Sequence, residues 1–498
     1  MGDIHCVSSS PRRILRPGPL RPPSLRLQAL ATSVVLSLLF VLVYGSTNWL
    51  TAQRPDADVR EWYFAWELTV IPYVPLLTVP YMSVDLLFFM AAFLCTTQRE
   101  LRVLSQRIVF SILIAAAFFL LLPLRLAWPR RPAVDGWFGE FVERSFTAPF
   151  LMEYPHNLFP ALHIVLCLIL ADVYARHTRG WIRAASQAWF VLIGLSTVLA
   201  WQHHLVDIAG GCVVAGFAFY FFRESAVRLP VVKNVRIGSY YAAGAAAVLA
   251  LAPSVWPWGV FLLWPAAALA IVAAAYFGLG PGIFRKENGL LPLSTRFVLA
   301  PVLVGQYLSL LYYRRQCRVW DEISPGVLIG RTLDEAEAST AVQRGVTAVL
   351  DLTAEFSAAT ALRATNYLNL PILDLTAPTQ EQLQTAANFI RENAQHGTVY
   401  LHCKIGYSRS AAAAGAYLIA SGQAATSEEA FARLRQARPS IVIRPEAVES
   451  LHQFERNAKA VATGTAASAA KVLAPSGQEQ DAGIPDCVST AAAAGPNG

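Results

Sequence analysis

The sequence predicts a chain of two parts: a polytopic all-α membrane domain with about eight transmembrane helices, followed by a C-terminal α/β domain. Composition is the first reason, because 55% of the 498 residues are hydrophobic and only 15% are charged, whereas roughly a quarter are charged in soluble proteins. The second reason is a series of long apolar runs up to residue 278. The third is a change of pattern beyond residue 320, where short strand-like runs alternate with helical segments.

The predicted membrane part begins after a polar, proline-rich and basic tail at 1–26. The apolar run at 27–50 is longer than a signal-peptide core and lacks a convincing cleavage site, so we expect a retained transmembrane helix. Seven further apolar runs occupy 75–95, 108–125, 158–175, 186–202, 205–222, 238–252 and 256–278. We therefore expect one membrane domain at 27–225 and additional transmembrane helices at 226–290.

Basic residues predict the orientation of these helices. With one helix counted between residues 63 and 95, every arginine- and lysine-rich loop falls on the same side of the membrane, which should be the cytoplasm. Basic loops beside a bilayer also account for the net charge of +7. Since no nucleic-acid-binding module is recognisable, we expect the membrane, and no nucleic acid, as a partner. The prediction is a multi-pass protein of the cell (inner) membrane.

The apolar segment at 291–320 joins the two parts. Three arginines follow its apolar run directly, so we expect an interfacial linker helix on the cytoplasmic surface. The alternative is a ninth crossing, which would place the C-terminal domain outside the cell. The α/β domain is expected at 321–460, and a disordered tail rich in Ala, Gly and Ser at 461–498. The seven cysteines are scattered and predict no disulfide framework.

Strand and helix patterns alternate within the predicted α/β domain. Strands are expected at 327–329, 347–352 and 397–401, and helices at 333–344 and 411–420. Two more helices are indicated by the capping residues Thr379 and Thr426, each followed three positions later by Gln or Glu.

Residues 402–410 read His-Cys-x5-Arg-Ser, a spacing that lets one thiol attack a phosphate ester. Cys403 falls between a predicted strand and a predicted helix, and its thiolate is the expected nucleophile. Arg409 can hold two phosphate oxygens with its planar fork, and Ser410 can donate a hydrogen bond to the cysteine sulfur. The loop's N–H groups should converge on the phosphate; its residues are Lys404, Ile405, Gly406, Tyr407, Ser408 and Arg409.

A general acid should protonate the leaving oxygen. Asp374 is the candidate, because it lies on a loop between a short apolar run and the helix that begins after Thr379. Asp351 is the competing candidate, although its position at a strand end places it deeper in the fold. The alternative to a catalytic loop is a buried structural cysteine at the end of a strand.

Residues 321–455 resemble a dual-specificity phosphatase domain of the protein-tyrosine-phosphatase superfamily. The resemblance implies a four- or five-stranded sheet with helices on both faces. It also implies hydrolysis through a phosphocysteine, without metal or cofactor, in which Cys403 is the nucleophile, Arg409 binds phosphate and Asp374 is the acid. The loop is similar to that of the mitochondrial lipid phosphatase that acts on phosphatidylglycerophosphate, which favours a lipid phosphate as substrate.

A second group of polar residues lies in the membrane part. His203 and Asp207 are four residues apart and share a helix face, so the carboxylate can orient the ring for attack on phosphorus, with His163 protonating the leaving group. Polar residues at membrane depth are functional candidates. The alternative is ordinary histidines at a water interface, which is our interpretation of His156, His177 and His204.

These residues resemble the type-2 phosphatidic acid phosphatase superfamily, whose third motif is S-R-x5-H-x3-D and whose core has six helices. The resemblance covers about 27–225, with Thr197 in place of the motif arginine, and implies phosphate contacts from Arg125 and Arg131. The Phe-Pro-x-Leu-His pattern that ends at His163 is similar to the inositol-phosphorylceramide synthase branch. Bacterial membrane proteins that fuse these two domain types are the architecture that the chain resembles.

The sequence therefore predicts a membrane-embedded phosphoric monoester hydrolase that acts on a phospholipid or lipid phosphate. Its cysteine site would face the cytoplasm, and the His/His/Asp site would face outward as a lipid phosphatase or headgroup transferase. The main alternative is a tethered protein phosphatase with a phosphoprotein substrate and an inactive membrane domain. A non-catalytic receptor or scaffold that binds phospholipids is the third possibility.

Overall fold

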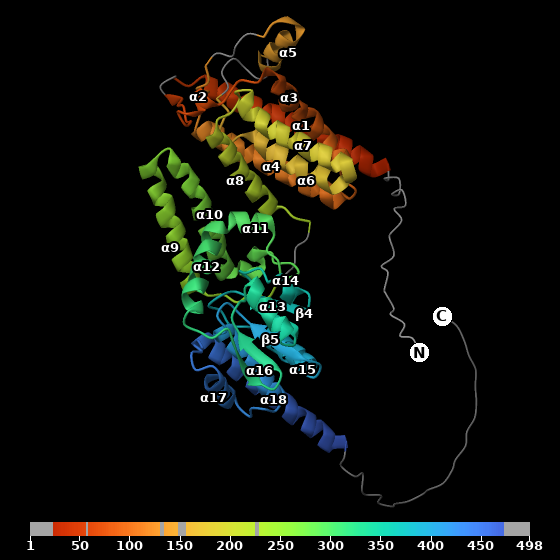
Figure 1. The fold of residues 1–498 in the computed structure, drawn as a ribbon, viewed down its shortest axis with the longest axis vertical. Coiled ribbons are helices and arrows are strands. Elements are labelled where there is room, and N and C mark those ends of the chain that lie inside the picture. Colours follow the sequence, from red (N-terminus) through yellow and green to blue (C-terminus); the bar gives the residue numbers. More distant parts are fainter. Residues whose placement is uncertain (1–22, 56–57, 130–133, 148–155, 225–228, 473–498) are drawn as a thin grey trace, which may run out of the picture.

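The computed structural model describes residues 23–55, 58–129, 134–147, 156–224 and 229–472 (Figure 1). Most of the predicted basic tail at 1–26 lies outside these ranges. The same holds for residues 473–498 of the predicted C-terminal tail.

The N-terminal part begins with a helical bundle (Figure 1). One apolar cluster runs through its long helices and forms its core. The proline-rich stretch before residue 81 is broken into two short helical turns, as proline's missing N–H favours. The elements are α1 (Pro23–Ala52), α2 (Glu67–Val70), η2 (Pro75–Leu77), α3 (Thr78–Leu94), α4 (Gln98–Leu121), α5 (Gly136–Thr147), α6 (Leu162–His177), α7 (Gly180–Leu199) and α8 (Leu205–Phe221).

A second helical group lies between this bundle and the C-terminal domain (Figure 1). Its two long helices, α9 and α10, pack against each other, and α12 packs against α10. Its elements are α9 (Val235–Leu251), η3 (Ala252–Val255), η4 (Trp258–Leu262), α10 (Leu263–Ala274), η5 (Ala275–Leu279), η6 (Gly280–Phe284), α11 (Leu293–Val298) and α12 (Ala300–Arg314).

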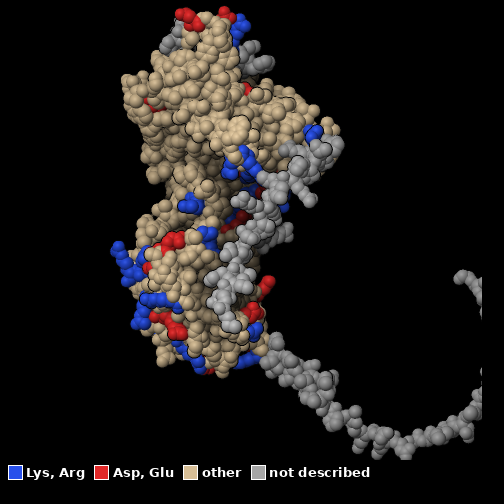
Figure 2. Space-filling model, turned by 45° about the vertical axis from the view of Figure 1, so that its right-hand side comes forward, with Lys and Arg blue, Asp and Glu red and all other residues tan. Residues whose placement is uncertain are grey.

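Six helices of the described chain are long and apolar enough to cross a membrane. They are Ser24–Ala52, Pro75–Leu94, Gln98–Leu121, Gly180–Leu199, Val235–Val255 and Trp258–Phe284. The two remaining predicted spans form α6 and α8, with 16 and 17 residues, which is less than the roughly 20 that a straight crossing needs. On the face shown in Figure 2, most charged side chains lie over the lower half of the molecule, and the upper half is mainly uncharged between its top end and its lower margin.

The C-terminal domain is built on a five-stranded sheet in the order β1-β2-β5-β3-β4. Only β1 runs antiparallel, to β2, and the other neighbours are parallel. This confirms the predicted α/β class and adds two edge strands to the three predicted strands. The strands are β1 (Trp320–Ser324), β2 (Val327–Gly330), β3 (Val346–Thr353), β4 (Asn366–Ile372) and β5 (Thr398–His402).

Helices cover both faces of this sheet. Successive residues of a strand point to opposite faces, and apolar side chains on each face pack against helices. Leu350 and Leu401 join the cluster under α15–α18, while Val349 and Tyr400 join the cluster under α13 and α14. The last helix continues to Val472, past the predicted domain end at 460. The helices are α13 (Glu335–Gln343), α14 (Thr360–Arg363), α15 (Gln380–Asn393), α16 (Ser408–Ala420), α17 (Ser427–Ala437) and α18 (Pro445–Val472).

The α/β domain packs directly on the second helical group. The side chain of Lys286, which follows η6, is buried, and its Nζ lies 2.6 Å from Oδ2 of Asp351 and 3.0 Å from the carbonyl oxygen of Thr353. Leu373, on the loop after β4, belongs to the same apolar cluster as Tyr276 of η5. The loop that carries Asp374 therefore packs against the second helical group.

Candidate active site

Cys403 lies at the C-terminal end of β5, which is the central strand of the sheet, and its side chain is buried. The helix α16 begins at Ser408, so the predicted strand–loop–helix arrangement around the motif is present. The loop 403–409 opens at the carboxyl edge of the parallel strands, where ligands of α/β folds bind.

Three carbonyl groups of this loop are held by donors from neighbouring segments. The hydroxyl and the N–H of Thr332 donate to the carbonyls of Cys403 (3.2 Å) and Lys404 (3.1 Å), and Nη2 of Arg438 donates to the carbonyl of Ile405 (3.0 Å). Across the described residues, the N–H groups of 404–409 donate to no backbone carbonyl. They remain available, together with the N-terminus of α16, to bind an anion.

Gly406 is required by the geometry of the loop. Its φ angle is +76°, and a Cβ atom there would lie 2.5 Å from the carbonyl oxygen of Gly330. Any other residue would both strain the backbone and displace the neighbouring strand end. Gly406 therefore allows the loop to approach the end of β2 closely.

Arg409 is almost completely buried and is held by carboxylates. Its guanidinium forms two hydrogen bonds with Glu355, of 2.7 and 3.1 Å, and a third of 3.1 Å with Oδ1 of Asp374. It also donates to the carbonyl of Ile372 at 2.8 Å. Burial lowers the pKa of a guanidinium, but these carboxylates outweigh burial and hold the pKa of Arg409 well above its usual value. The site thus contains a fixed positive charge at the mouth of the loop.

Glu355 was not among the residues that the sequence analysis selected. Its only local signal is a carboxylate that follows a buried strand, since β3 ends at Thr353. That position places it at the same sheet edge as Cys403. Such a signal is shared by many structural acids, so the pairing with Arg409 could be recognised only in three dimensions.

Asp374 reaches the same site from the loop after β4. Besides its bond to Arg409, its Oδ2 lies 3.5 Å from Nζ of Lys404, and its Oδ1 accepts from the N–H of Leu375 at 3.1 Å. Burial raises the pKa of a carboxyl group, but the charges of Arg409 and Lys404 outweigh it, so the pKa of Asp374 lies below its ordinary value.

Asp351, the competing acid, occupies a different environment. It is fully buried, and its carboxylate accepts hydrogen bonds from Lys286, from Thr353 and from the hydroxyl of Tyr367. Burial alone would raise its pKa, yet Lys286 and the neighbouring His402 hold the pKa of Asp351 below its ordinary range. It anchors the two parts of the chain to each other.

Ser410 follows Arg409 in α16 and is completely buried. Its hydroxyl has no hydrogen-bond partner among the described residues. An unpartnered buried hydroxyl is unfavourable unless a ligand or a charge receives it. Its donor capacity fits the predicted role beside the sulfur of Cys403.

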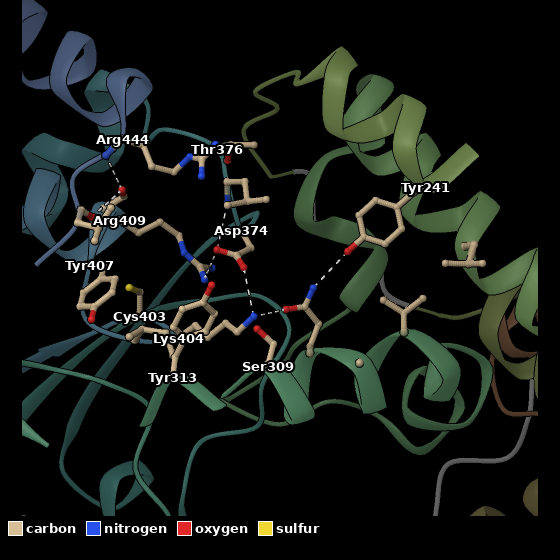
Figure 3. Close-up of a pocket in the computed structure, with 18 of the residues that line it drawn as sticks. Tyr241, Ser309, Tyr313, Asp374, Thr376, Cys403, Lys404, Tyr407, Arg409 and Arg444 are labelled. Atoms are coloured by element: carbon tan, nitrogen blue, oxygen red, sulfur yellow. Dashed lines mark hydrogen bonds and ion pairs between the residues drawn. The ribbon is translucent and has the colours of Figure 1, made fainter. Parts of the chain in front are cut away.

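The loop faces a cavity of about 600 Å³ whose opposite wall comes from the second helical group (Figure 3). Nζ of Lys404 donates to Oε1 of Gln306 (2.7 Å), and Nε2 of Gln306 donates to the hydroxyl of Tyr241 (3.2 Å). These bonds connect the loop through α12 to α9 across the cavity. The helix residues on the cavity wall are Tyr241, Leu269, Pro301, Val302, Gly305, Gln306, Ser309 and Tyr313.

The structure also brings His163, His203 and Asp207 together in the first bundle. The rings of His163 and His203 lie 6.0 Å apart, and Nδ1 of His203 lies 3.5 Å from Oδ2 of Asp207. His203 and Asp207 are buried. The hydroxyl of Tyr81 lies 3.3 Å from Nδ1 of His163, and the two rings stack.

His204 and His156 are also buried, which contradicts their interpretation as histidines at a water interface. The contacts of His204 show how its ring is held. Its Nδ1 lies 3.0 Å from Oε2 of the buried Glu67, and its Nε2 accepts from the N–H of Ala127 at 3.2 Å. Glu67 lies on the proline-broken stretch, where a single acidic residue after Trp66 gave little local signal.

Of the two arginines predicted to bind phosphate at this second site, the structure describes one. Arg125 is half exposed, and its Nε pairs with Oε1 of Glu61 at 2.9 Å. Arg131 lies outside the described residues. The structure thus places three of the predicted residues in one group, namely His163, His203 and Asp207.

Comparison with known proteins identifies the C-terminal domain. Residues 332–457 match the family described as "Dual specificity phosphatase, catalytic domain". The chain is 29% identical over 179 residues to the phosphatidylglycerophosphate phosphatase PTPMT2 of Arabidopsis thaliana. This match covers 34% of this chain and 78% of that protein. It is 38% identical over 98 residues to the human phosphatidylglycerophosphatase and protein-tyrosine phosphatase 1, and this match covers 19% of this chain and 48% of the human protein.

Solved structures give matches of similar extent. Tk-PTP in its active form has 30% sequence identity and a TM-score of 0.26, covering 28% of this chain and 97% of that chain. PTPMT1 in complex with PI(5)P has 27% identity and a TM-score of 0.27, covering 29% of this chain and 99% of that chain. From the family match and the sequence relatives, we conclude that the C-terminal part of the chain is a dual-specificity phosphatase domain of the protein-tyrosine-phosphatase superfamily, homologous to the PTPMT lipid phosphatases.

Proposed function

We propose that this protein hydrolyses phosphomonoesters on the headgroups of membrane lipids. The observation that carries this proposal is the composition of the cavity: one wall is the loop with Cys403 and Arg409, and the facing wall is formed by α9, α10 and α12. A lipid phosphate needs both surfaces, since its phosphate requires cations and amide donors while its glycerol and acyl parts require an apolar wall. The relatives that are phosphatidylglycerophosphate phosphatases support the same substrate class.

The proposed reaction has two steps. The thiolate of Cys403 attacks phosphorus, the bond to the leaving oxygen breaks, and Asp374 gives that oxygen its proton. Water then attacks the phosphocysteine, Asp374 takes a proton from it, and the sulfur leaves while the Ser410 hydroxyl stabilises its charge. Arg409 and the N–H groups of the loop bind the phosphoryl oxygens in both steps.

Asp374 must be protonated to act as an acid, although its pKa is low in the substrate-free site. A bound phosphate dianion compensates the charges of Arg409 and Lys404, which are the groups that lower this pKa. We therefore expect substrate binding to raise the pKa of Asp374 and so to load the acid with its proton.

We place this site at the cytoplasmic face of the cell (inner) membrane. Six long apolar helices support a membrane-embedded protein, and the distribution of basic loops supports the orientation. The same reasoning keeps the proposed domain limits: the membrane domain at 27–225, additional helices at 226–290, the linker at 291–320 and the phosphatase domain at 321–460. The linker contains α11 and α12, and α12 contributes to the cavity.

Turnover of phosphatidylglycerophosphate in vesicles, compared with that of a phosphotyrosine peptide, tests the substrate class. We expect the lipid to be hydrolysed at least about tenfold faster, because only the lipid can occupy the helix wall. Gly305 lies on that wall with open space around it, so Gly305→Leu should reduce lipid turnover and spare a small aryl phosphate. Gly45→Leu, in equally open space on α1, is the matched control. Turnover of the peptide alone would favour the tethered protein phosphatase instead.

The membrane part supports a second candidate function, transfer or hydrolysis of a lipid phosphate at His163, His203 and Asp207. The observation that favours it is the burial of His203 with Asp207 at 3.5 Å and with the ring of His163 nearby. His203 would attack phosphorus, Asp207 would stabilise the resulting imidazolium, and His163 would protonate the leaving oxygen.

Replacement of His203 by alanine tests this second site. With a labelled phospholipid and an alcohol acceptor, His203→Ala should lower phosphoryl or headgroup transfer by about 10³-fold or more. Cys403-dependent turnover of an aryl phosphate should stay unchanged in this variant. Label that appears only as free phosphate would show hydrolysis in place of transfer. Loss of both activities together would contradict two independent sites.

A further inference from the structure

The loop that carries Asp374 is attached by its backbone to the helices of the second group. The hydroxyl of Tyr276, on η5, donates to the carbonyl of Asp374 at 2.8 Å. Nδ2 of Asn234, the N-cap residue of α9, donates to the next carbonyl, that of Leu375, at 2.8 Å. The N–H of Asn234 also donates to the carbonyl of Tyr276 at 3.0 Å. Two consecutive backbone carbonyls of the loop are thus bound by residues of α9 and η5 that are themselves hydrogen-bonded to each other.

The conformation of this loop needs such support. Leu375 has a φ angle of +59°, a left-handed conformation that is unfavourable for a residue with a side chain. Its N–H donates to Oδ1 of Asp374, so the strained residue also orients the carboxylate. On the other side of Asp374, Leu373 is buried in the cluster that contains Tyr276.

The two ends of Asp374 are held by different parts of the chain. Its carboxylate faces Arg409 and Lys404 of the phosphatase domain, and its carbonyl faces Tyr276. The carboxylate is already in contact with Arg409, at 3.1 Å, so the backbone anchor limits how far it can follow this attraction into the loop that must receive the phosphate. The anchor keeps the carboxyl group at the mouth, where a leaving oxygen would lie.

We propose that Tyr276 and Asn234 are positioning residues that hold the general acid, so that helices outside the phosphatase domain complete acid catalysis. This inference rests on the proposed roles of Cys403 and Asp374. The family match begins at residue 332, so both anchors lie outside the matched domain. They act on proton transfer to the leaving group and leave the phosphate cradle as it is.

The full chain in lipid nanodiscs allows a test with two small substrates, an aryl phosphate and an alkyl phosphate. An aryl oxygen leaves readily without a proton, whereas an alkyl oxygen needs the acid. Because hydrolysis of the phosphocysteine is common to both substrates, the rate to compare is leaving-group release in a single turnover. We expect Tyr276→Phe to lower this rate for the alkyl phosphate about 10- to 100-fold and to change it for the aryl phosphate less than about threefold. Asn234→Ser, which keeps a capping oxygen and removes the amide donor, should act in the same direction.

Tyr220→Phe is the matched control. Its hydroxyl also donates to a backbone carbonyl, that of Ile283 at 2.8 Å, and its ring lies in the same apolar cluster as Tyr276. We expect this variant to lower neither activity. Inhibition by inorganic phosphate should be equal in all variants, because the cradle is intact.

The double variant Asp374→Asn with Tyr276→Phe separates positioning from a general structural effect. If Tyr276 acts through Asp374, the double variant should be no slower on the alkyl phosphate than Asp374→Asn alone. Additive losses, or equal losses on both substrates, would overturn the inference. If Asp374→Asn is slowed selectively on the alkyl phosphate but Tyr276→Phe is not, the positioning role of Tyr276 is overturned and Asp374 remains the general acid. If Asp374→Asn itself shows no selective loss, the acid assignment fails and the inference fails with it.

Discussion

Replacement of Arg409 by lysine is expected to lower kcat/KM for any phosphomonoester by about 10³-fold or more. The guanidinium is buried and makes four hydrogen bonds, two of them to Glu355. A lysine keeps the charge but has no planar fork, so it cannot hold Glu355 and two phosphate oxygens in fixed directions. Steady-state kinetics with a small aryl phosphate measures the effect without dependence on lipid presentation.

Two comparisons make this result specific to the site. Arg433→Lys changes an exposed ion pair on α17 and should leave activity unchanged. Glu355→Gln keeps the side-chain shape and weakens the support of Arg409, so its loss should be smaller than that of Arg409→Lys. If Arg409→Lys retains activity within about tenfold of the parent protein, the guanidinium is not the principal phosphate ligand.

Lys286→Met is expected to destabilise the packing of the phosphatase domain on the helices by about 3–5 kcal/mol. The pair of Lys286 and Asp351 is buried, with 2.6 Å between Nζ and Oδ2, and removal of the lysine leaves a carboxylate without its counter-charge. Thermal unfolding in detergent and limited proteolysis between the two parts should both report the change. Lys459→Met, which removes an exposed lysine that pairs with Glu455 on α18, is the control and should change stability by less than about 1 kcal/mol.

The same variant should become more sensitive to acid. Lys286 helps to hold the pKa of Asp351 below its ordinary value against the opposing effect of burial. A carboxyl group with a lowered folded-state pKa contributes stability above its unfolded pKa of about 4, and this contribution is lost as the pH falls through the folded-state value. In Lys286→Met the folded-state pKa rises, so unfolding should begin at a higher pH than in the parent protein. Unchanged acid unfolding would contradict the coupling.

The parts of the site that are contiguous in sequence could be predicted. The spacing from Cys403 to Arg409 and Ser410 is local, and the flanking strand and helix follow from a buried apolar run and an alanine-rich segment. Asp374 could be selected because it lies on a loop between a short apolar run and a helix whose start is marked by the capping pair Thr379 and Gln382. These predictions depend on neighbours in the chain, which the sequence specifies directly.

The parts that arise from packing could not be predicted in this way. Lys286 reads as one of several basic residues beside a membrane, yet it is buried against Asp351. Gln306 lies in a segment predicted to be a linker, although it contacts Lys404 across the cavity. Glu67 and His204 pair over a separation of more than a hundred residues. In each case the partner is far away in sequence, and only the fold brings the two charges or dipoles together.

A covalent phosphate on Cys403 is the most direct test of the proposed chemistry. In Asp374→Asn with an aryl phosphate, formation of the phosphocysteine needs no acid, while its hydrolysis lacks the base. The intermediate should therefore accumulate, and mass spectrometry of the acid-quenched reaction should find phosphate on the peptide that contains Cys403. Turnover without phosphorus on that sulfur, or a Cys403→Ser variant that keeps the parent rate, would contradict the account.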